Sequence, residues 1–174
     1  MLIASVLISA IGSSLPAQST TNPLEFADKG LLQCWRPDLS KKTCRVIAAY
    51  RKTGPGTYDD TGILALSSRR PITLETHSPV VVRGDAVCGA VRTEELRSSI
   101  VRDGARIVAP ADAEPILDQI AQFMAPIDGQ ETCTRFEPSG PDFIAKISVA
   151  GRYRPQLDQK IKLISPADGY IVTP

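Results

Sequence analysis

Four cysteines, all lying beyond a long apolar N-terminal stretch, constrain this chain more than any other feature. They are Cys34, Cys44, Cys88 and Cys133. In an exported chain an even number of cysteines predicts disulfides, and four cysteines allow three pairings. We favour Cys34–Cys44, which closes a local loop, together with Cys88–Cys133, which ties the core across a helix. Chain-entropy reasoning gives about 3 and about 4 kcal/mol for these two closures.

Residues 1–19 predict a secretory signal peptide. The stretch contains no charged side chain, and its apolar core runs into the small-x-small pattern Ala17-Gln18-Ser19. A membrane anchor is the alternative, but a spanning helix needs about 20 mostly apolar residues, and serines interrupt this shorter stretch. We therefore expect a cleaved leader, a periplasmic or secreted location, and no transmembrane segment after cleavage.

Size and composition predict one folded domain behind the leader. The chain has 174 residues, of which 43% are hydrophobic and 22% charged, and these values exclude wholesale disorder. The net charge of +1 argues against a nucleic-acid-binding protein, which would carry a strongly basic surface. We expect a signal peptide at 1–19, a linker at 20–28 and a single domain at 29–174.

Short strands separated by turn residues make up most of the predicted secondary structure. Gly54-Pro55-Gly56, Gly84-Asp85 and Asp103-Gly104 are turn sequences between apolar runs, so each predicts a hairpin. The expected strands cover residues 30–36, 43–52, 58–67, 72–76, 80–83, 86–91, 100–101, 107–108, 143–149 and 160–164.

One long helix is expected among these strands. Asp112 is placed to cap it and Pro126 to end it. Apolar residues between them recur at helical spacing, which predicts one buried stripe. Together with the strands, this helix indicates an α+β fold, in which an antiparallel sheet carries one main α-helix packed on it and two disulfides stabilise the domain.

Charge is unevenly distributed along the chain. Residues 36–52 hold six basic side chains against one acid, a net of +5, while residues 112–142 have a net of −6. A basic cystine loop indicates a binding surface for an anionic envelope surface or polymer, and another envelope protein is the alternative partner. The residues expected to form this surface are Trp35, Arg36, Lys41, Lys42 and Arg45.

Catalysis has little support in the sequence. His77 is the only histidine, and Glu75 lies two residues earlier on the same side of a predicted strand, so the pair could serve a small periplasmic hydrolase. Two adjacent acid pairs, Asp59-Asp60 and Glu94-Glu95, could serve carboxylate chemistry. Each pair has a structural explanation as a turn or a helix start, and we expect no catalytic residue.

No cofactor or metal is expected either. The cysteines show no C-x-x-C pair and lie far from the single histidine, so zinc ligation is disfavoured. The Asp-Gly dipeptides stand outside the spacing of a calcium loop, and no glycine-rich phosphate loop occurs.

A resemblance to known sequences lies in six short segments: Cys34–Asp38, Lys41–Arg45, Ala86–Gly89, Tyr153–Pro155, Asp158-Gln159 and Asp168–Tyr170. In these segments the chain resembles uncharacterised secreted proteins of alphaproteobacteria. The resemblance implies a periplasmic or secreted location and transfers no functional residue. With the observations above, it leads us to expect an exported, non-catalytic binding or envelope-associated module. A purely structural or assembly protein is a further alternative.

Overall fold

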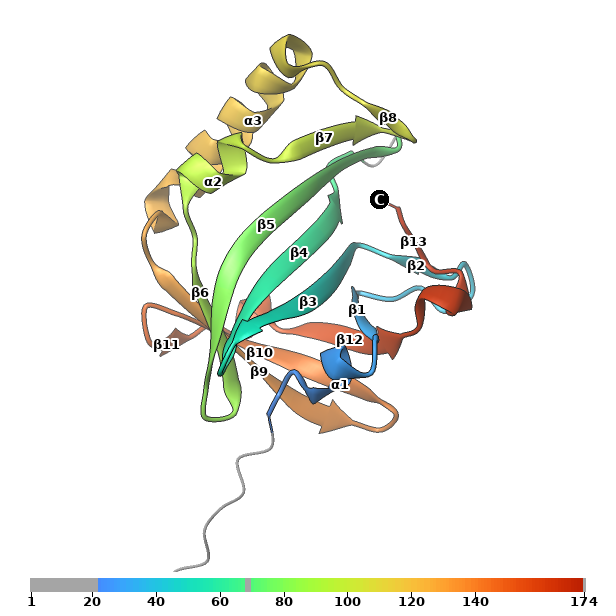
Figure 1. The fold of residues 1–174 in the computed structure, drawn as a ribbon, viewed down its shortest axis with the longest axis vertical. Helices are drawn as coiled ribbons and strands as arrows, with labels where there is room; N and C mark the ends of the chain where they lie inside the picture. The colour runs from blue at the N-terminus through green and yellow to red at the C-terminus, as the bar shows by residue number, and fades with distance from the viewer. Residues whose placement is uncertain (1–21, 68–69, 174) are drawn as a thin grey trace, which may run out of the picture.

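A closed antiparallel β-barrel forms the body of the protein (Figure 1). The structure is a computed structural model and describes residues 22–67 and 70–173. Eight strands form the barrel: β1 (Leu32–Trp35), β3 (Val46–Gly54), β4 (Thr57–Ala65), β5 (Ile72–Arg83), β6 (Ala86–Ala90), β9 (Glu131–Ser139), β10 (Asp142–Val149) and β12 (Gln159–Ile164).

The ring closes because each barrel strand pairs with two neighbours. The order around it is β4-β3-β1-β12-β10-β9-β6-β5, and β5 then pairs with β4. The short β1 links β3 to β12, since Gln33 lies opposite Ala48 of β3 on one side and Leu163 of β12 on the other. Closure leaves these strands without a free edge for unwanted pairing.

Further elements extend from the barrel rims. In the described residues they are α1 (Glu25–Asp28), β2 (Thr43–Cys44), α2 (Thr93–Arg97), β7 (Ile100–Asp103), β8 (Arg106–Ile107), α3 (Pro110–Met124), η1 (Ala125–Ile127), β11 (Arg152–Tyr153), η2 (Pro155–Leu157), η3 (Pro166–Asp168) and β13 (Ile171–Val172). β7 and β8 continue the sheet from β5, and β11 pairs with β10. β13 runs parallel to β2, so the C-terminal end lies beside the cystine loop (Figure 1).

The predicted α+β fold class is wrong. Half of the protein is in strands and 22% is helical, and the strands close on themselves rather than forming a sheet with one helix on it. The strand missing from the sequence prediction is β9, in which Glu131, Arg135 and Glu137 break the apolar pattern. β9 pairs with β6 and β10, and without it the wall stays open.

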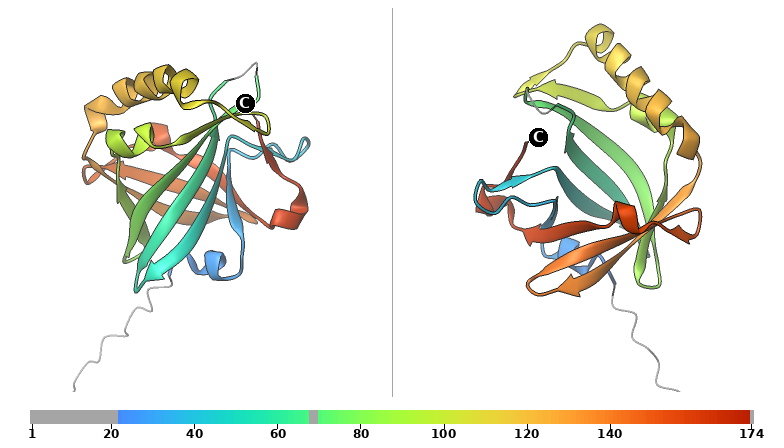
Figure 2. Two further views of the ribbon diagram at one scale, coloured as in Figure 1. Left: turned by 45° about the horizontal axis from the view of Figure 1, so that its top comes forward. Right: turned by 180° about the vertical axis from the view of Figure 1, so that it is seen from behind.

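The main helix confirms its predicted stripe but lies at the end of the barrel. Ala113, Leu117 and Ala121 are its buried residues, and the first two pack with Leu74 of β5 and Val101 of β7. The helix begins at Pro110, two residues before the predicted cap, and ends before Pro126. In the left view of Figure 2, α3 lies across the upper end of the barrel.

The N-terminal segment closes the opposite end. Leu24 is fully buried and packs with Tyr58, Val80 and Val87 in the barrel interior. Phe26 of α1 meets the ring of Tyr50 edge to face, with ring centroids 6.0 Å apart. Part of the segment expected as a linker, residues 22–28, therefore contributes to the core. The predicted signal peptide, 1–19, lies outside the described residues.

Both favoured disulfides are present. Cys34–Cys44 joins β1 to β2, with its Cα atoms 5.3 Å apart. Cys88–Cys133 joins residues that lie directly opposite each other on β6 and β9, with Cα atoms 4.1 Å apart. The first bridge holds the basic loop, and the second fastens the strand that completes the barrel wall.

Candidate functional site

The cystine loop is a tight, well-bonded turn. The backbone N–H groups of Asp38 and Thr43 donate to each other's carbonyl oxygens at 2.8 and 3.1 Å. The Asp38 carboxylate accepts hydrogen bonds from the Ser40 hydroxyl and from the backbone N–H groups of Ser40 and Lys41. The Ser40 hydroxyl is the main cause of a lowered pKa at Asp38, and the Lys41 N–H adds to it. The loop therefore holds its shape at neutral pH.

Arg36 begins this loop in a left-handed backbone conformation, with φ at 51°. For a residue with a side chain, this conformation costs about 1–2 kcal/mol. Two backbone hydrogen bonds and the disulfide secure it: the Arg36 N–H donates to Lys160 O at 2.8 Å, and the Arg45 N–H donates to Trp35 O at 2.9 Å. The surrounding frame thus fixes where the Arg36 side chain leaves the backbone.

Three basic side chains line one hollow of about 370 Å³ beside the loop. They are Arg36, Lys41 and Arg45, and the acid in the lining is Asp38. Lys41 lies 3.6 Å from the Asp38 carboxylate and is 75% exposed. Within residues 22–67 and 70–173, no acidic side chain pairs with Arg36 or Arg45. The hollow therefore presents two unneutralised guanidinium groups.

The structure separates the other two predicted surface residues from this hollow. Trp35 donates its indole N–H to Gln33 Oε1 at 3.2 Å, and Gln33 is 1% exposed inside the barrel. Because alternate residues of a strand share a face, Trp35 points inward too. Lys42 donates to Asp168 O at 3.1 Å, at the end of η3. Of the five predicted residues, three meet and two do not.

The His77 and Glu75 pair lies on the outer wall. Glu75 and His77 lie on the face of β5 opposite to Leu74, which packs against α3 in the core. Their side chains therefore point outward. Glu75 accepts hydrogen bonds from the Arg102 guanidinium at 3.0 and 3.1 Å. His77 lies 3.6 Å from Glu75 and is 53% exposed, and its Nδ1 is 3.1 Å from the Thr61 hydroxyl. The carboxylate that would orient the imidazole is thus held mainly by Arg102.

The adjacent acid pair Asp59-Asp60 is split between the two faces of β4. Asp59 points outward and lies 3.0 Å from Arg51. Asp60 shares the inward face with Tyr58, a core residue, and its Oδ1 is enclosed without a hydrogen-bond partner among the described residues. Burial, helped by the charge of Asp59, raises the pKa of Asp60 to about 7. The two carboxyl groups cannot act together.

The burial of Asp60 is not among the features predicted from the sequence. Strand alternation was the available signal, because it places Asp60 on the same face as Tyr58. The second acid pair lies at the start of α2, where Glu95 is 3.6 Å from Arg92. In the structure, neither pair forms a two-carboxylate site.

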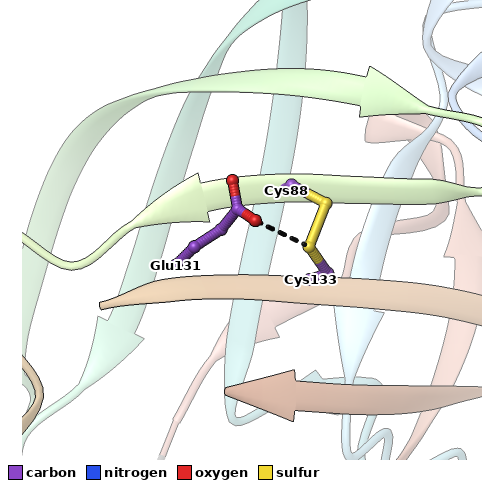
Figure 3. A group of neighbouring side chains, drawn as sticks. All are labelled: Cys88, Glu131 and Cys133. Atoms are coloured by element: carbon purple, nitrogen blue, oxygen red, sulfur yellow. Dashed lines mark hydrogen bonds between the residues drawn. A yellow bond between two sulfur atoms is a disulfide. The ribbon is translucent and has the colours of Figure 1, made fainter. Parts of the chain in front are cut away.

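One group of potential metal ligands occurs in the described part of the chain: Cys88, Glu131 and Cys133 (Figure 3). The two sulfur atoms are bonded to each other, so neither offers the thiolate that a metal requires. The Glu131 carboxylate also forms an ion pair with Arg83. As long as the disulfide is intact, this group is structural.

Comparisons with protein-family models, curated proteins and solved structures found no match. Within the described ranges, no helix combines the length and the apolar character needed to cross a membrane. Among the described residues, the basic hollow beside the cystine loop is the strongest candidate for a functional site.

Proposed function

We propose that this is an exported, disulfide-stabilised binding protein that holds anionic groups of the cell envelope in the hollow between Arg36, Lys41 and Arg45. One observation carries the proposal. Three cations line a single hollow of about 370 Å³, and two of them are guanidinium groups without an acidic partner in the described chain. An anion entering the hollow would supply the missing counter-charges.

Guanidinium groups suit this task. Each presents a planar set of N–H donors that matches the two oxygens of a carboxylate or phosphate, and charge-assisted bonds of this kind are about twice as strong as neutral ones. Lys41 is also exposed and adds a third positive charge to the hollow. Asp38 is engaged by its own turn, so it neutralises the hollow only in part.

The frame around the hollow supports binding rather than chemistry. Arg36 is set by its backbone hydrogen bond to Lys160 O, and Arg45 follows the disulfide cysteine Cys44 directly. A site held in advance loses little entropy when a ligand enters. The hollow is open to solvent, so its affinity should fall as salt screens the charges.

Export is the remaining part of the proposal. Two disulfides suit an oxidising compartment, and the apolar residues 1–19 have the composition of a secretory leader. Envelope polymers and lipid headgroups in that compartment carry carboxylates and phosphates, which are the groups that the hollow would take.

The direct test is an NMR titration with two small anions, glucuronate and inorganic phosphate. We expect shifts at the side-chain Nε–H of Arg36 and Arg45, and an affinity that is about tenfold weaker in R36Q/R45Q. K52Q is the matched control, because Lys52 is an exposed cation on β3 outside the hollow. Equal binding by R36Q/R45Q and the wild type would overturn the proposal.

A further inference from the structure

A second hollow, of about 530 Å³, lies on the other side of Arg36. Its lining begins with Arg36 and Pro37 and continues through Gln156, Leu157 and Gln159. Arg36 lines both hollows, so the two hollows meet at this residue. The backbone bond from Arg36 N–H to Lys160 O joins the cystine loop to β12 at this point and fixes the two hollows relative to each other.

Asp158 and Lys160 also line the second hollow, and their charges are already neutralised within the protein. Lys160 lies 2.9 Å from the buried Asp142. Asp158 accepts a hydrogen bond from Lys146 at 2.8 Å and one from the Tyr153 hydroxyl at 2.5 Å. Arg36 is thus the one unneutralised charge in this lining within the described residues. The second hollow is chemically different from the first.

Neutral hydrogen-bonding groups dominate the rest of the lining of the second hollow. The side-chain amides of Gln156 and Gln159 make no hydrogen bond within the described ranges, and each can both donate and accept. Leu157 is 38% exposed and, with Pro37, supplies apolar surface beside them. Free amides next to a small apolar patch suit a sugar ring, which offers hydroxyl groups at its rim and C–H groups on its face.

We propose that the two hollows form one track for a linear acidic polysaccharide, with a uronate carboxylate at Arg36 and Arg45 and a neighbouring neutral sugar at Gln156 and Gln159. This inference rests on the proposed function, because the first hollow must hold the carboxylate. A lone anion would use the first hollow only. A lipid headgroup would leave the amides of the second hollow without a role.

Arg36 is the residue on which the track depends. It belongs to the lining of both hollows, and its left-handed backbone is a costly conformation in a non-glycine residue. Strained backbone of this kind persists where the surrounding structure over-determines it, and it is often found at ligand sites. In this protein it places a cation at the junction between a charged hollow and a neutral one.

The test compares a tetrasaccharide of alternating glucuronate and N-acetylglucosamine with free glucuronate, by calorimetric titration. We expect the wild type to bind the tetrasaccharide about tenfold more tightly than the monomer. Q156A/Q159A should lose that advantage and still bind glucuronate as the wild type does. R45Q should weaken both ligands. Q119A/Q122A is the matched control, since both glutamines are exposed on α3 and neither lines the two hollows.

Each outcome decides a different claim. Unchanged tetrasaccharide affinity in Q156A/Q159A would overturn the track, while weaker glucuronate binding by R45Q would keep the proposed function. Unchanged binding of both ligands by R45Q would remove the proposed function as well. Vesicles with phosphatidylglycerol that bind the protein when the tetrasaccharide does not would identify a lipid as the source of the anion, and would also overturn the track.

Discussion

Tyr50 and Asp60 lie directly opposite each other on β3 and β4, with both side chains inside the barrel. The Tyr50 hydroxyl donates to Gln33 Oε1 at 3.2 Å, whereas Asp60 Oδ1 has no partner among the described residues. Burial, with the Asp60 charge as the lesser cause, raises the pKa of Tyr50 well above its usual value. The charge of Asp60 therefore helps burial to keep the Tyr50 phenol neutral.

Asp60 makes the stability of the barrel depend on pH. Its pKa is raised from 3.8 to about 7, so the folded protein binds the proton more tightly than the unfolded chain does. The free energy of unfolding is therefore highest below about pH 4, where Asp60 is protonated in both the folded and the unfolded state. It falls as the pH rises to about 7. By linkage, the free energy of unfolding loses on the order of 4 kcal/mol across this range.

The variant D60N tests this dependence, with D59N as its matched control on the outer face. We expect D60N to be more stable than the wild type at pH 8 and to lack the fall between pH 4 and pH 7 in urea titrations. D59N should keep the wild-type dependence and lose at most about 1 kcal/mol with its Arg51 ion pair. A wild-type pH profile in D60N would show that Asp60 is not the group responsible.

Two substitutions of Arg36 distinguish the effect of backbone strain on stability from the effect of charge on binding. Glycine accepts a positive φ without penalty and alanine does not, so R36G should be more stable than R36A by about 1 kcal/mol. Both variants lack the guanidinium and should lose the same share of glucuronate affinity. Chemical denaturation and NMR titration measure the two effects. Equal stability of R36G and R36A would contradict the strain that we assign to this position.

The two disulfides should differ in what they contribute to stability and to glucuronate binding. C34A/C44A opens the cystine loop, so we expect a loss of about 3 kcal/mol together with weaker glucuronate binding. C88A/C133A should cost about 4 kcal/mol and leave that affinity unchanged while the barrel is folded. Denaturation curves and titrations at low temperature distinguish the two. Loss of binding in folded C88A/C133A would show that the site depends on the whole wall.

Reversing the charge of the hollow should abolish envelope association. We expect the triple variant R36E/K41E/R45E to fold with a wild-type circular dichroism spectrum and to appear in the soluble fraction after cell fractionation. The control carries the same change in net charge at exposed sites outside the hollow, in the triple variant K52E/R106E/R152E. Envelope association that survives in the first triple variant, or disappears in both, would refute a specific role for the hollow.

The intact mass of the exported protein tests its maturation. We expect loss of residues 1–17 or 1–19, and no cysteine that reacts with an alkylating reagent without prior reduction. Such a mass agrees with both disulfides and leaves Leu24, which is fully buried, in the mature chain. A full-length chain with reactive thiols would contradict export and would return Cys88, Glu131 and Cys133 to consideration as metal ligands.

Local patterns in the sequence predicted the elements and the covalent links but not the closure. The hairpin turn at Gly84-Asp85 and the stripe of α3 are set by neighbouring residues, and the structure confirms both. Closure requires β4 to pair with β5 while β9 fills the wall between β6 and β10. The charged residues of β9 face solvent and conceal its strand pattern, so no local signal revealed that pairing.

The candidate site was predicted only in part, because the sequence shows which residues are neighbours along the chain but not which residues the fold brings together. Clustered charge beside a cystine pointed to Arg36, Lys41 and Arg45, and the fold brings them together. Trp35 was assigned to the same surface because it is their neighbour in sequence. Strand alternation sends it into the barrel with Gln33. The second hollow draws on Gln156 and Gln159, more than a hundred residues further along the chain, which sequence proximity could not reveal.

The position of β1 has a consequence for how the chain folds. This first strand of the barrel pairs with the last, Leu32 opposite Ile164, so the ring cannot form until nearly the whole polypeptide has been synthesised. Contacts so distant in sequence make folding slow. A slow-folding chain stays unstructured long enough to be threaded through a translocation channel, so this topology suits a protein that reaches its compartment before it folds.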